Sequence, residues 1–203
     1  MKGAIHALKY DRLYPAARGL GRLLAQAIAQ LAGEAPAELL VVPVPLHRSK
    51  YAERGFNQAR TLAAHALRFL HKSHPGWRLT LAPSTLMRLR ATESQAGLTL
   101  HERSLNVRGA FTVSDPAVVA SKHILLIDDI FTTGATVRAA AKALVRAGAA
   151  SVWVATLARA RRTSGRRYVP TDNAEDNDKL SSYAGAAEMQ HDSNFSSQDK
   201  SFF

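Results

Sequence analysis

The stretch His123–Thr136, HILLIDDIFTTGAT, decides the fold of this chain. It opens on an unbroken run of β-forming apolar residues, which is typical of a central strand covered on both faces. The acidic pair Asp128 and Asp129 follows at the carboxyl end of that strand. A loop of small hydroxyl residues and a glycine comes next, and leads into an apolar helical stripe that ends at Gly148. The sequence therefore predicts a strand–loop–helix unit with two carboxylates where the strand meets the loop.

The residue types in this unit indicate two kinds of binding. Adjacent carboxylates at the end of a strand are costly to bury unless they bind something, such as hydroxyl groups or a metal ion. The backbone N–H groups of a Thr/Gly loop, with the positive end of the following helix dipole, favour an anion. A phosphorylated sugar offers both hydroxyls and a phosphate. The alternative is a solvated Asp-Asp turn in an ordinary strand–helix unit.

The rest of the chain alternates strands and helices. Apolar periodicity predicts helices over 14–32, 56–71 and 134–147, and strands over 38–45, 84–87, 109–113, 122–128 and 151–157. Such alternation indicates an α/β fold with a parallel sheet flanked by helices. We expect one domain over residues 1–158. Residues 159–203 are first basic and then acidic, lack apolar periodicity, and are expected to be a disordered tail.

Charge and composition limit the function classes. The net charge is +11, yet residues 171–203 carry −5, so the remainder carries +16. A basic globular part indicates polyanionic partners, either nucleic acid or a phosphate-rich substrate, although it can also serve only to keep a protein soluble. The absence of cysteine excludes disulfides and thiolate zinc sites. No signal peptide or membrane-length apolar run is visible, so we expect a cytoplasmic protein without membrane insertion.

A second polar segment, Pro43–Ala59, follows the first predicted strand. Its loop should open onto the same edge of the sheet as the acidic pair, because the carboxyl ends of parallel strands meet there. Basic groups opposite a phosphosugar suit a pyrophosphate. The candidates are His47, Arg48, Lys50 and Arg54. The alternative is a basic surface loop that precedes a helix.

A third segment, Met87–Phe111, is a long basic and polar insert. A polar loop near a charged site can act as a flexible lid that excludes water from a cationic sugar intermediate. The candidate lid residues are Arg88, Arg90, Thr92 and Gln95. The alternative is a helical arm.

The first motif resembles the phosphoribosyl-diphosphate (PRPP) loop of type I phosphoribosyltransferases over 13 residues. The resemblance implies that the carboxylates of Asp128 and Asp129 form the catalytic site and bind the ribose 2′- and 3′-hydroxyls. It further implies that the following loop holds the 5′-phosphate through Ile130, Phe131, Thr132, Thr133, Gly134, Ala135 and Thr136. Mg²⁺ bound together with PRPP is the implied cofactor, with no metal ligand set supplied by the protein.

The other two motifs narrow the resemblance. RGFNQA at 54–59 and the pattern R-x-R-x-T-x-x-Q from Arg88 are similar to the ComF family of competence-associated proteins. That family implies a type I phosphoribosyltransferase fold, and phosphoribosyl transfer to a nitrogen acceptor with pyrophosphate release. The alternative is a non-catalytic PRPP- or nucleotide-binding accessory protein that contacts single-stranded DNA or DNA-uptake proteins. Dimers are common among such folds, so a second copy of the chain is a candidate partner. Family members commonly begin with a zinc-ribbon-like segment, which this sequence lacks, so no zinc site is inferred.

Overall fold

The computed structural model describes residues 14–90, 107, 109–131, 133–159 and 166–168. Its helices are α2 (Tyr14–Ala29), α3 (Arg48–Arg54), α4 (Gln58–Ser73), α6 (Pro116–Val119) and α7 (Ala135–Arg146). Its strands are β1 (Glu38–Pro43), β2 (Arg78–Leu81), β3 (Leu86–Arg88), β4 (Phe111–Val113), β5 (His123–Phe131), β6 (Ser151–Arg159) and β7 (Arg166–Tyr168).

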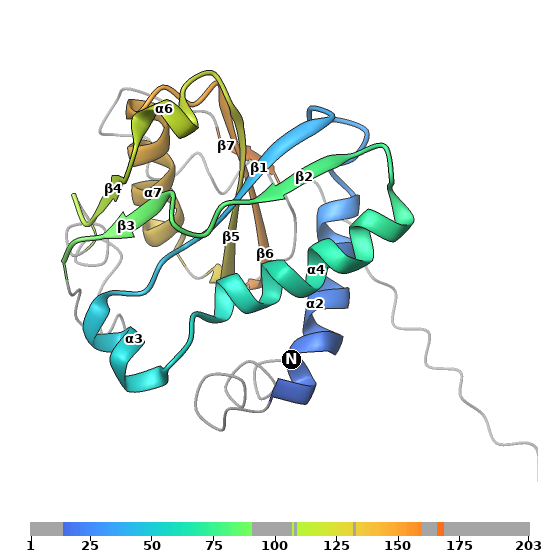
Figure 1. Cartoon of the computed structure of the whole chain (residues 1–203), viewed down its shortest axis with the longest axis horizontal. Helices are drawn as coiled ribbons and strands as arrows, with labels where there is room; N and C mark the ends of the chain where they lie inside the picture. The colour runs from blue at the N-terminus through green and yellow to red at the C-terminus, as the bar shows by residue number, and fades with distance from the viewer. Residues whose placement is uncertain (1–13, 91–106, 108, 132, 160–165, 169–203) are drawn as a thin grey trace, which may run out of the picture.

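Five strands form the main sheet in the order β2-β1-β5-β6-β7. The first four run parallel, whereas β7 runs antiparallel to β6 at the edge. Strands β3 and β4 form a separate antiparallel hairpin. The predicted parallel sheet flanked by helices is therefore confirmed, and the strand that carries the acidic pair lies at its centre (Figure 1).

Two apolar clusters cover the two faces of this sheet. Helices α2 and α4 lie on one face, where they form the helix-side core with Leu125 and Ile127 of β5. Helix α7 and the β3–β4 hairpin lie on the other face, where they form the hairpin-side core with Ile124 and Leu126 (Figure 1). All four β5 side chains are fully buried, because alternate residues of a strand point to opposite faces and both faces are covered.

Several element boundaries differ from those that the sequence predicts. Strand β1 ends at Pro43 rather than at 45, although the Val44 N–H still donates to the Ile127 carbonyl. Strand β5 runs to Phe131 rather than to 128, because β6 continues to pair with it. The expected loop after β1 contains the seven-residue helix α3, which buries no side chain and is defined by its end caps.

Besides α3, three described elements lie outside the predicted set, namely β2, α6 and β7. Strand β2 and helix α6 have four residues each, too few to show periodicity in the sequence. The 84–87 and 109–113 segments do form strands, which pair as β3 and β4. Strand β7 falls in the segment expected to be disordered, so that expectation is wrong for its three residues. The rest of that tail, residues 160–165 and 169–203, lies outside the described residues.

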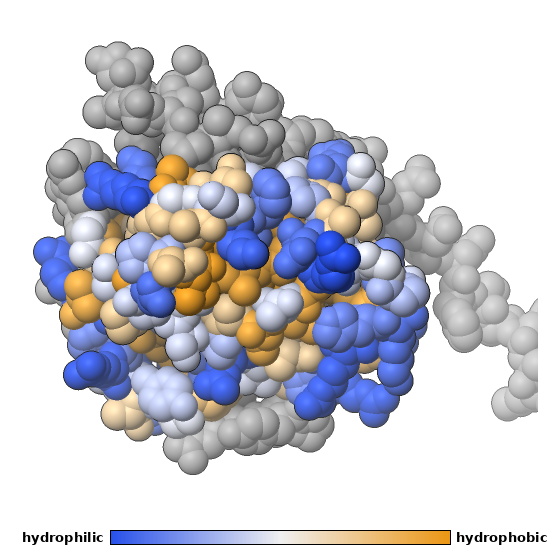
Figure 2. All heavy atoms as spheres, turned by 45° about the horizontal axis from the view of Figure 1, so that its top comes forward, coloured by the Kyte–Doolittle hydropathy of each residue, from blue (hydrophilic) through white to orange (hydrophobic). Residues whose placement is uncertain are grey.

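The surface mixes polar and apolar residues. Figure 2 brings the top of Figure 1 forward and shows hydrophobic residues in a band across the middle of that face, with hydrophilic residues at its margins. Exposed apolar side chains are normal on a protein surface. Within the described ranges, no helix is both long and apolar enough to cross a membrane.

Candidate functional site

The acidic pair lies where the two neighbours of β5 differ in length. Strand β1 pairs with β5 only as far as Pro43 opposite Ile127, and the last link is the Val44 N–H, which donates to the Ile127 carbonyl at 2.8 Å. Strand β6 follows β5 further, through the pairs that begin at Asp128 and Thr156. The end of β5 therefore projects beyond β1, and this overhang opens toward the segment that follows β1.

The two carboxylates of the pair are half-buried and differ in their surroundings. The Asp129 backbone N–H donates to Asp128 Oδ1 at 2.9 Å. By alternation along β5, Asp128 follows Ile124 and Leu126, whose side chains belong to the hairpin-side core. The Asp128 carboxylate is thus held by its own main chain on the face that the β3–β4 hairpin covers.

The loop after β5 bends sharply at Gly134. This residue has φ 75°, in the left-handed region, and begins α7 without a capping side chain. A Cβ at this position would collide with the Phe131 ring, lying 2.9 Å from its Cε2 atom. Glycine is therefore required both for the backbone angle and for the close approach of the ring. The Ala135 N–H donates to Thr133 Oγ1 at 3.3 Å, and Thr132 lies outside the described residues.

The tight bend brings the amino end of α7 to the overhang of β5. The first N–H groups of a helix lack partners within the helix, and they carry the positive end of its dipole. Helix α7 has twelve residues and no acidic residue in its first turn. The arrangement thus favours an anion beside two carboxylates, the combination that the sequence predicted for Ile130–Thr136.

The basic segment after β1 is a capped helix rather than a loop. His47 caps α3, because its Nδ1 accepts from the Ser49 N–H at 3.3 Å. Gly55 ends α3 at φ 77°, and its N–H donates to the Tyr51 carbonyl at 2.7 Å. Of the predicted pyrophosphate cations, Arg48 is exposed, whereas His47, Lys50 and Arg54 are half-buried. All four follow β1, the parallel neighbour of β5, so they lie at the same edge of the sheet as the acidic pair.

Asn57 fixes the next helix to this edge. Its Oδ1 accepts from the Arg60 N–H at 3.1 Å and caps α4, while its Nδ2 donates to the Val44 carbonyl at 3.0 Å. One side chain therefore joins the start of α4 to the end of β1. The RGFNQA motif, which the sequence placed beside the site, is in this respect a structural joint.

The third motif enters the site through Arg88. This residue ends β3 and is half-buried, and its guanidinium carbon lies 5.4 Å from the centroid of the Phe111 ring. Burial lowers the pKa of Arg88, and the negative charge of Asp128 opposes this shift. Arg90 is exposed. Thr92 and Gln95 lie outside the described residues, so their role as lid residues stays a prediction.

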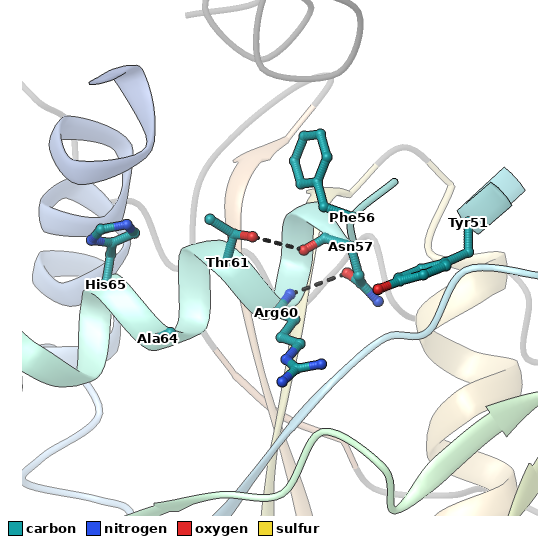
Figure 3. Close-up of a pocket in the computed structure, with 7 residues that line it drawn as sticks. All are labelled: Tyr51, Phe56, Asn57, Arg60, Thr61, Ala64 and His65. Carbon is teal, nitrogen blue, oxygen red and sulfur yellow. Dashed lines mark hydrogen bonds between the residues drawn. The ribbon is translucent and has the colours of Figure 1, made fainter. Parts of the chain in front are cut away.

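A second feature was missed by the sequence reasoning. A pocket of about 310 Å³ lies along α3 and α4 (Figure 3). Its lining residues are Tyr51, Phe56, Asn57, Arg60, Thr61, Ala64 and His65. Figure 3 shows Tyr51 pointing toward Asn57 and His65 at the far end beside α2. The only sequence signal was the helical spacing of 57, 60–61 and 64–65, which forms a polar stripe opposite the apolar face of α4.

Comparison with known proteins identifies the family to which this chain belongs. The family model for the phosphoribosyl transferase domain matches residues 52–192. The chain belongs to the phosphoribosyltransferase family. Among curated proteins it is 35% identical over 157 residues to the DNA utilization protein YhgH of Escherichia coli K12, covering 76% of this chain and 65% of that protein. It thus spans about two thirds of that relative's length.

Two further relatives define its branch. Competence protein F of Haemophilus influenzae is 28% identical over 159 residues, which cover 77% of this chain and 66% of that protein. Competence protein ComFC of Bacillus subtilis is 40% identical over 121 residues, which cover 59% and 44%. The chain is therefore a ComF-type phosphoribosyltransferase-like protein, and the sequence-based assignment is confirmed.

The solved structures that match this chain are more distant in sequence. A hypoxanthine phosphoribosyltransferase from Staphylococcus aureus is 14% identical, with a TM-score of 0.41, over 69% of this chain and 62% of that chain. The glutamine PRPP amidotransferase from B. subtilis, complexed with ADP and GMP, is 23% identical, with a TM-score of 0.39, over 70% and 26%. The family match and the order of the sheet identify the type I phosphoribosyltransferase α/β fold.

Proposed function

We propose that this protein binds PRPP with Mg²⁺ at the carboxyl edge of its sheet and transfers the phosphoribosyl group to a nitrogen acceptor. The observation that carries the proposal is the overhang of β5, where two half-buried carboxylates lie beside a glycine-dependent loop and a helix amino end. Asp128 and Asp129 would accept hydrogen bonds from the ribose hydroxyls. The loop 130–136 would hold the 5′-phosphate through backbone N–H groups.

The reaction exchanges one bond at the sugar for another. The bond from C1 to the pyrophosphate oxygen breaks, and its electron pair leaves with pyrophosphate. The nitrogen acceptor forms the new bond to C1 and loses a proton. The side chains of Arg48, Lys50 and Arg54 follow β1 at this edge and would stabilise the charge of the departing pyrophosphate.

Mg²⁺ fits this site as a companion of the ligand. The described ranges contain no group of three His, Cys, Asp or Glu side chains that could hold a metal ion. Mg²⁺ needs no such group, because it retains several waters and binds largely through substrate phosphates. Its chemical contribution would be to neutralise the pyrophosphate, while the acidic pair keeps the overhang attractive to a cation.

Calorimetric titration of PRPP with and without Mg²⁺ tests the proposal. We expect magnesium-dependent binding by the wild type and its loss in Asp128→Asn/Asp129→Asn. Asp115→Asn is the matched control, since that exposed carboxylate caps α6 and is not part of the overhang. A folded wild type that does not bind PRPP would refute the proposal, as would binding that survives in the double variant. A positive result justifies a screen of nitrogen acceptors for pyrophosphate release.

A second candidate function is favoured by the face formed by α2 and α4. Neither helix contains an acidic residue, although together they span 32 residues. Their exposed cations are Arg18, Arg22, Arg60, Arg68 and Lys72. The helices touch closely at Gly21, where a Cβ would lie 3.3 Å from the Ala66 backbone nitrogen. This α2–α4 basic face therefore carries positive charge that no carboxylate of these two helices offsets.

His65 shows that these cations converge. Burial is the main cause that lowers the His65 pKa, and the positive charges of Arg68 on α4 and Arg18 on α2 lower it further. The same His65 lines the pocket, and Tyr51 lies at the other end of that pocket. Tyr51 is 48% exposed, so its ring is accessible to a stacking partner. An accessible aromatic ring among converging cations suits a base and its flanking phosphates.

We infer that the α2–α4 basic face contacts single-stranded DNA, with a base at Tyr51 and phosphates along the arginines. The names of the relatives, which refer to DNA utilization and competence, support this inference. The role would be that of an accessory protein in DNA uptake. The lining of this pocket includes neither Asp128 nor the α3 cations proposed to stabilise pyrophosphate.

Fluorescence anisotropy with a labelled oligothymidylate tests the DNA role. Two arginine contacts account for about 1.4 of the slope of log K against log salt on a single strand. We therefore expect Arg60→Gln/Arg68→Gln to lower that slope by about this amount, and Lys142→Gln/Arg146→Gln on exposed α7 positions to lower it little. Tyr51→Ala should cost about 1–3 kcal/mol of binding. No binding at low salt, or equal effects of both double variants, would refute the inference.

A further inference from the structure

The hairpin formed by β3 and β4 aligns one cation with the acidic pair. Alternate residues of a strand share a face, so Leu86 and Arg88 point to the same side of β3. By the same rule Leu126 and Asp128 point to the same side of β5. Leu86 and Leu126 are both fully buried in the hairpin-side core. On each strand, the leucine thus packs in the hairpin-side core, and the charged residue two positions later lies toward the sheet edge.

The guanidinium of Arg88 is restrained on this face. Arg88 pairs with Phe111 across the hairpin, and its guanidinium carbon lies 5.4 Å from the centroid of that ring. Phe111 is itself only 7% exposed and belongs to the hairpin-side core. The Leu89 N–H donates to the Ala110 carbonyl at 2.9 Å and extends the hairpin past Arg88. The cation therefore rests on a buried ring within a paired backbone.

The surroundings of Arg88 agree with this placement of Arg88 and Asp128 on one face. Taking a guanidinium out of water disfavours its charge, and burial is the main cause that lowers the pKa of Arg88. The opposing influence on that pKa is the carboxylate of Asp128. The half-buried cation and the half-buried anion thus compensate each other across the hairpin and β5.

We infer that Arg88 is a positioning residue that orients the Asp128 carboxylate for the ribose and joins it to the β3–β4 hairpin. The inference rests on the proposed PRPP site and deepens it. The hairpin is the base from which the insert 91–106 leaves and to which it returns. A carboxylate held by Arg88 and by the Asp129 N–H presents fixed acceptors, whereas a released one would rotate toward water.

A double-mutant cycle on thermal unfolding tests the coupling without any ligand. The variants are Arg88→Met, Asp128→Asn and the two combined. We expect Arg88→Met to lower the Tm of the wild type by about 2 °C or more beyond the amount by which it lowers the Tm of Asp128→Asn. In the Asp128→Asn background residue 128 carries no charge, so removing the Arg88 cation costs less. Arg90→Met, two residues away and exposed, should show the same Tm effect in both backgrounds. Additive effects of Arg88→Met and Asp128→Asn would overturn the inference.

Titration of PRPP with Mg²⁺ tests the positioning role on the same variants. We expect Arg88→Met to weaken binding by about tenfold or more, and Arg88→Lys, which keeps the charge, to restore it to within about threefold of the wild type. Arg146→Met, at an exposed position in the last turn of α7, should bind as the wild type does. If Arg88→Lys binds as poorly as Arg88→Met while Tm is restored, the positioning role is wrong. A wild type that fails to bind refutes the proposed function instead, and the unfolding cycle still decides the coupling.

Discussion

Two glycines at opposite ends of α7 permit a matched test of the loop that follows the acidic pair. Gly134 begins the helix at φ 75°, and Gly148 follows its end at φ 93°. Both angles lie in the region that disfavours a side chain, so alanine carries the same kind of backbone penalty at either position. The space differs. A Cβ at 134 runs into the Phe131 ring, whereas one at 148 lies 3.5 Å from the Ala120 Cα, an ordinary contact.

The magnitudes follow from these contacts. The left-handed backbone costs alanine about 1–2 kcal/mol at each site. At 134 the Phe131 ring must also leave its place on the hairpin-side core, and an off-rotamer ring adds about 0.5–1.5 kcal/mol. Gly148→Ala should therefore lose about 1–2 kcal/mol and Gly134→Ala about 1.5–3.5 kcal/mol. For a chain of this size each kcal/mol lowers Tm by about 2–4 °C.

Calorimetric unfolding and PRPP titration on both variants form the assay. We expect the larger fall in Tm for Gly134→Ala, and weaker PRPP binding in that variant alone, because its alanine displaces Phe131 within the phosphate loop. Gly148→Ala should bind PRPP as the wild type does, since position 148 is at the far end of α7. Equal Tm shifts together with unchanged binding in both variants would refute the reasoning that the Gly134–Phe131 contact shapes the loop.

Three further predictions concern the frame of the site. Asn57→Ala should lower stability by about 2 kcal/mol in urea unfolding, since it removes both a helix cap and the bond to the Val44 carbonyl; a loss below about 0.5 kcal/mol would contradict this. Leu126→Ala, at a fully buried position, should cost about 2–5 kcal/mol in the same assay, and a smaller loss would mean that the sheet relaxes around it. Because the pKa of His65 is lowered in the folded state, the folded state binds fewer protons than the unfolded state below pH 6.5. The free energy of unfolding should therefore fall as the pH drops through that value. His65→Gln should make this fall smaller. Unfolding midpoints at neutral pH and near pH 5 measure this, and parallel profiles would contradict it.

The sequence was sufficient for the parallel sheet and for the shared edge of its two main motifs. Each motif follows a run of buried β-formers, and such runs pair in parallel when helices connect them. Helix α3 was not predictable in this way. It has seven residues and buries none of them, so it shows no apolar period, and it depends on the caps at His47 and Gly55.

Arg88 illustrates what pattern reasoning cannot supply. In the sequence it belongs to a run of polar and basic residues, which is typical of an exposed insert. In the structure it is the third residue of a three-residue strand, and its burial depends on Phe111, 23 positions further along the chain. A strand of that length has no measurable period. Only the long-range pairing of β3 with β4 separates Arg88 from the exposed Arg90.

The unequal lengths of the strands beside β5 explain why the site faces the way it does. Strand β6 supports β5 to its last residue, with Phe131 opposite Arg159, while β1 stops at Pro43. Because β1 leaves the ladder before β6 does, the segment that follows β1, with the cations of α3, lies at the end of β5. Pro43 is not what ends this ladder, because the Val44 N–H still donates to the Ile127 carbonyl and alternate residues of a strand bond to the same neighbour. The place where the chain leaves β1 for α3 is therefore what brings the cations to the acidic pair.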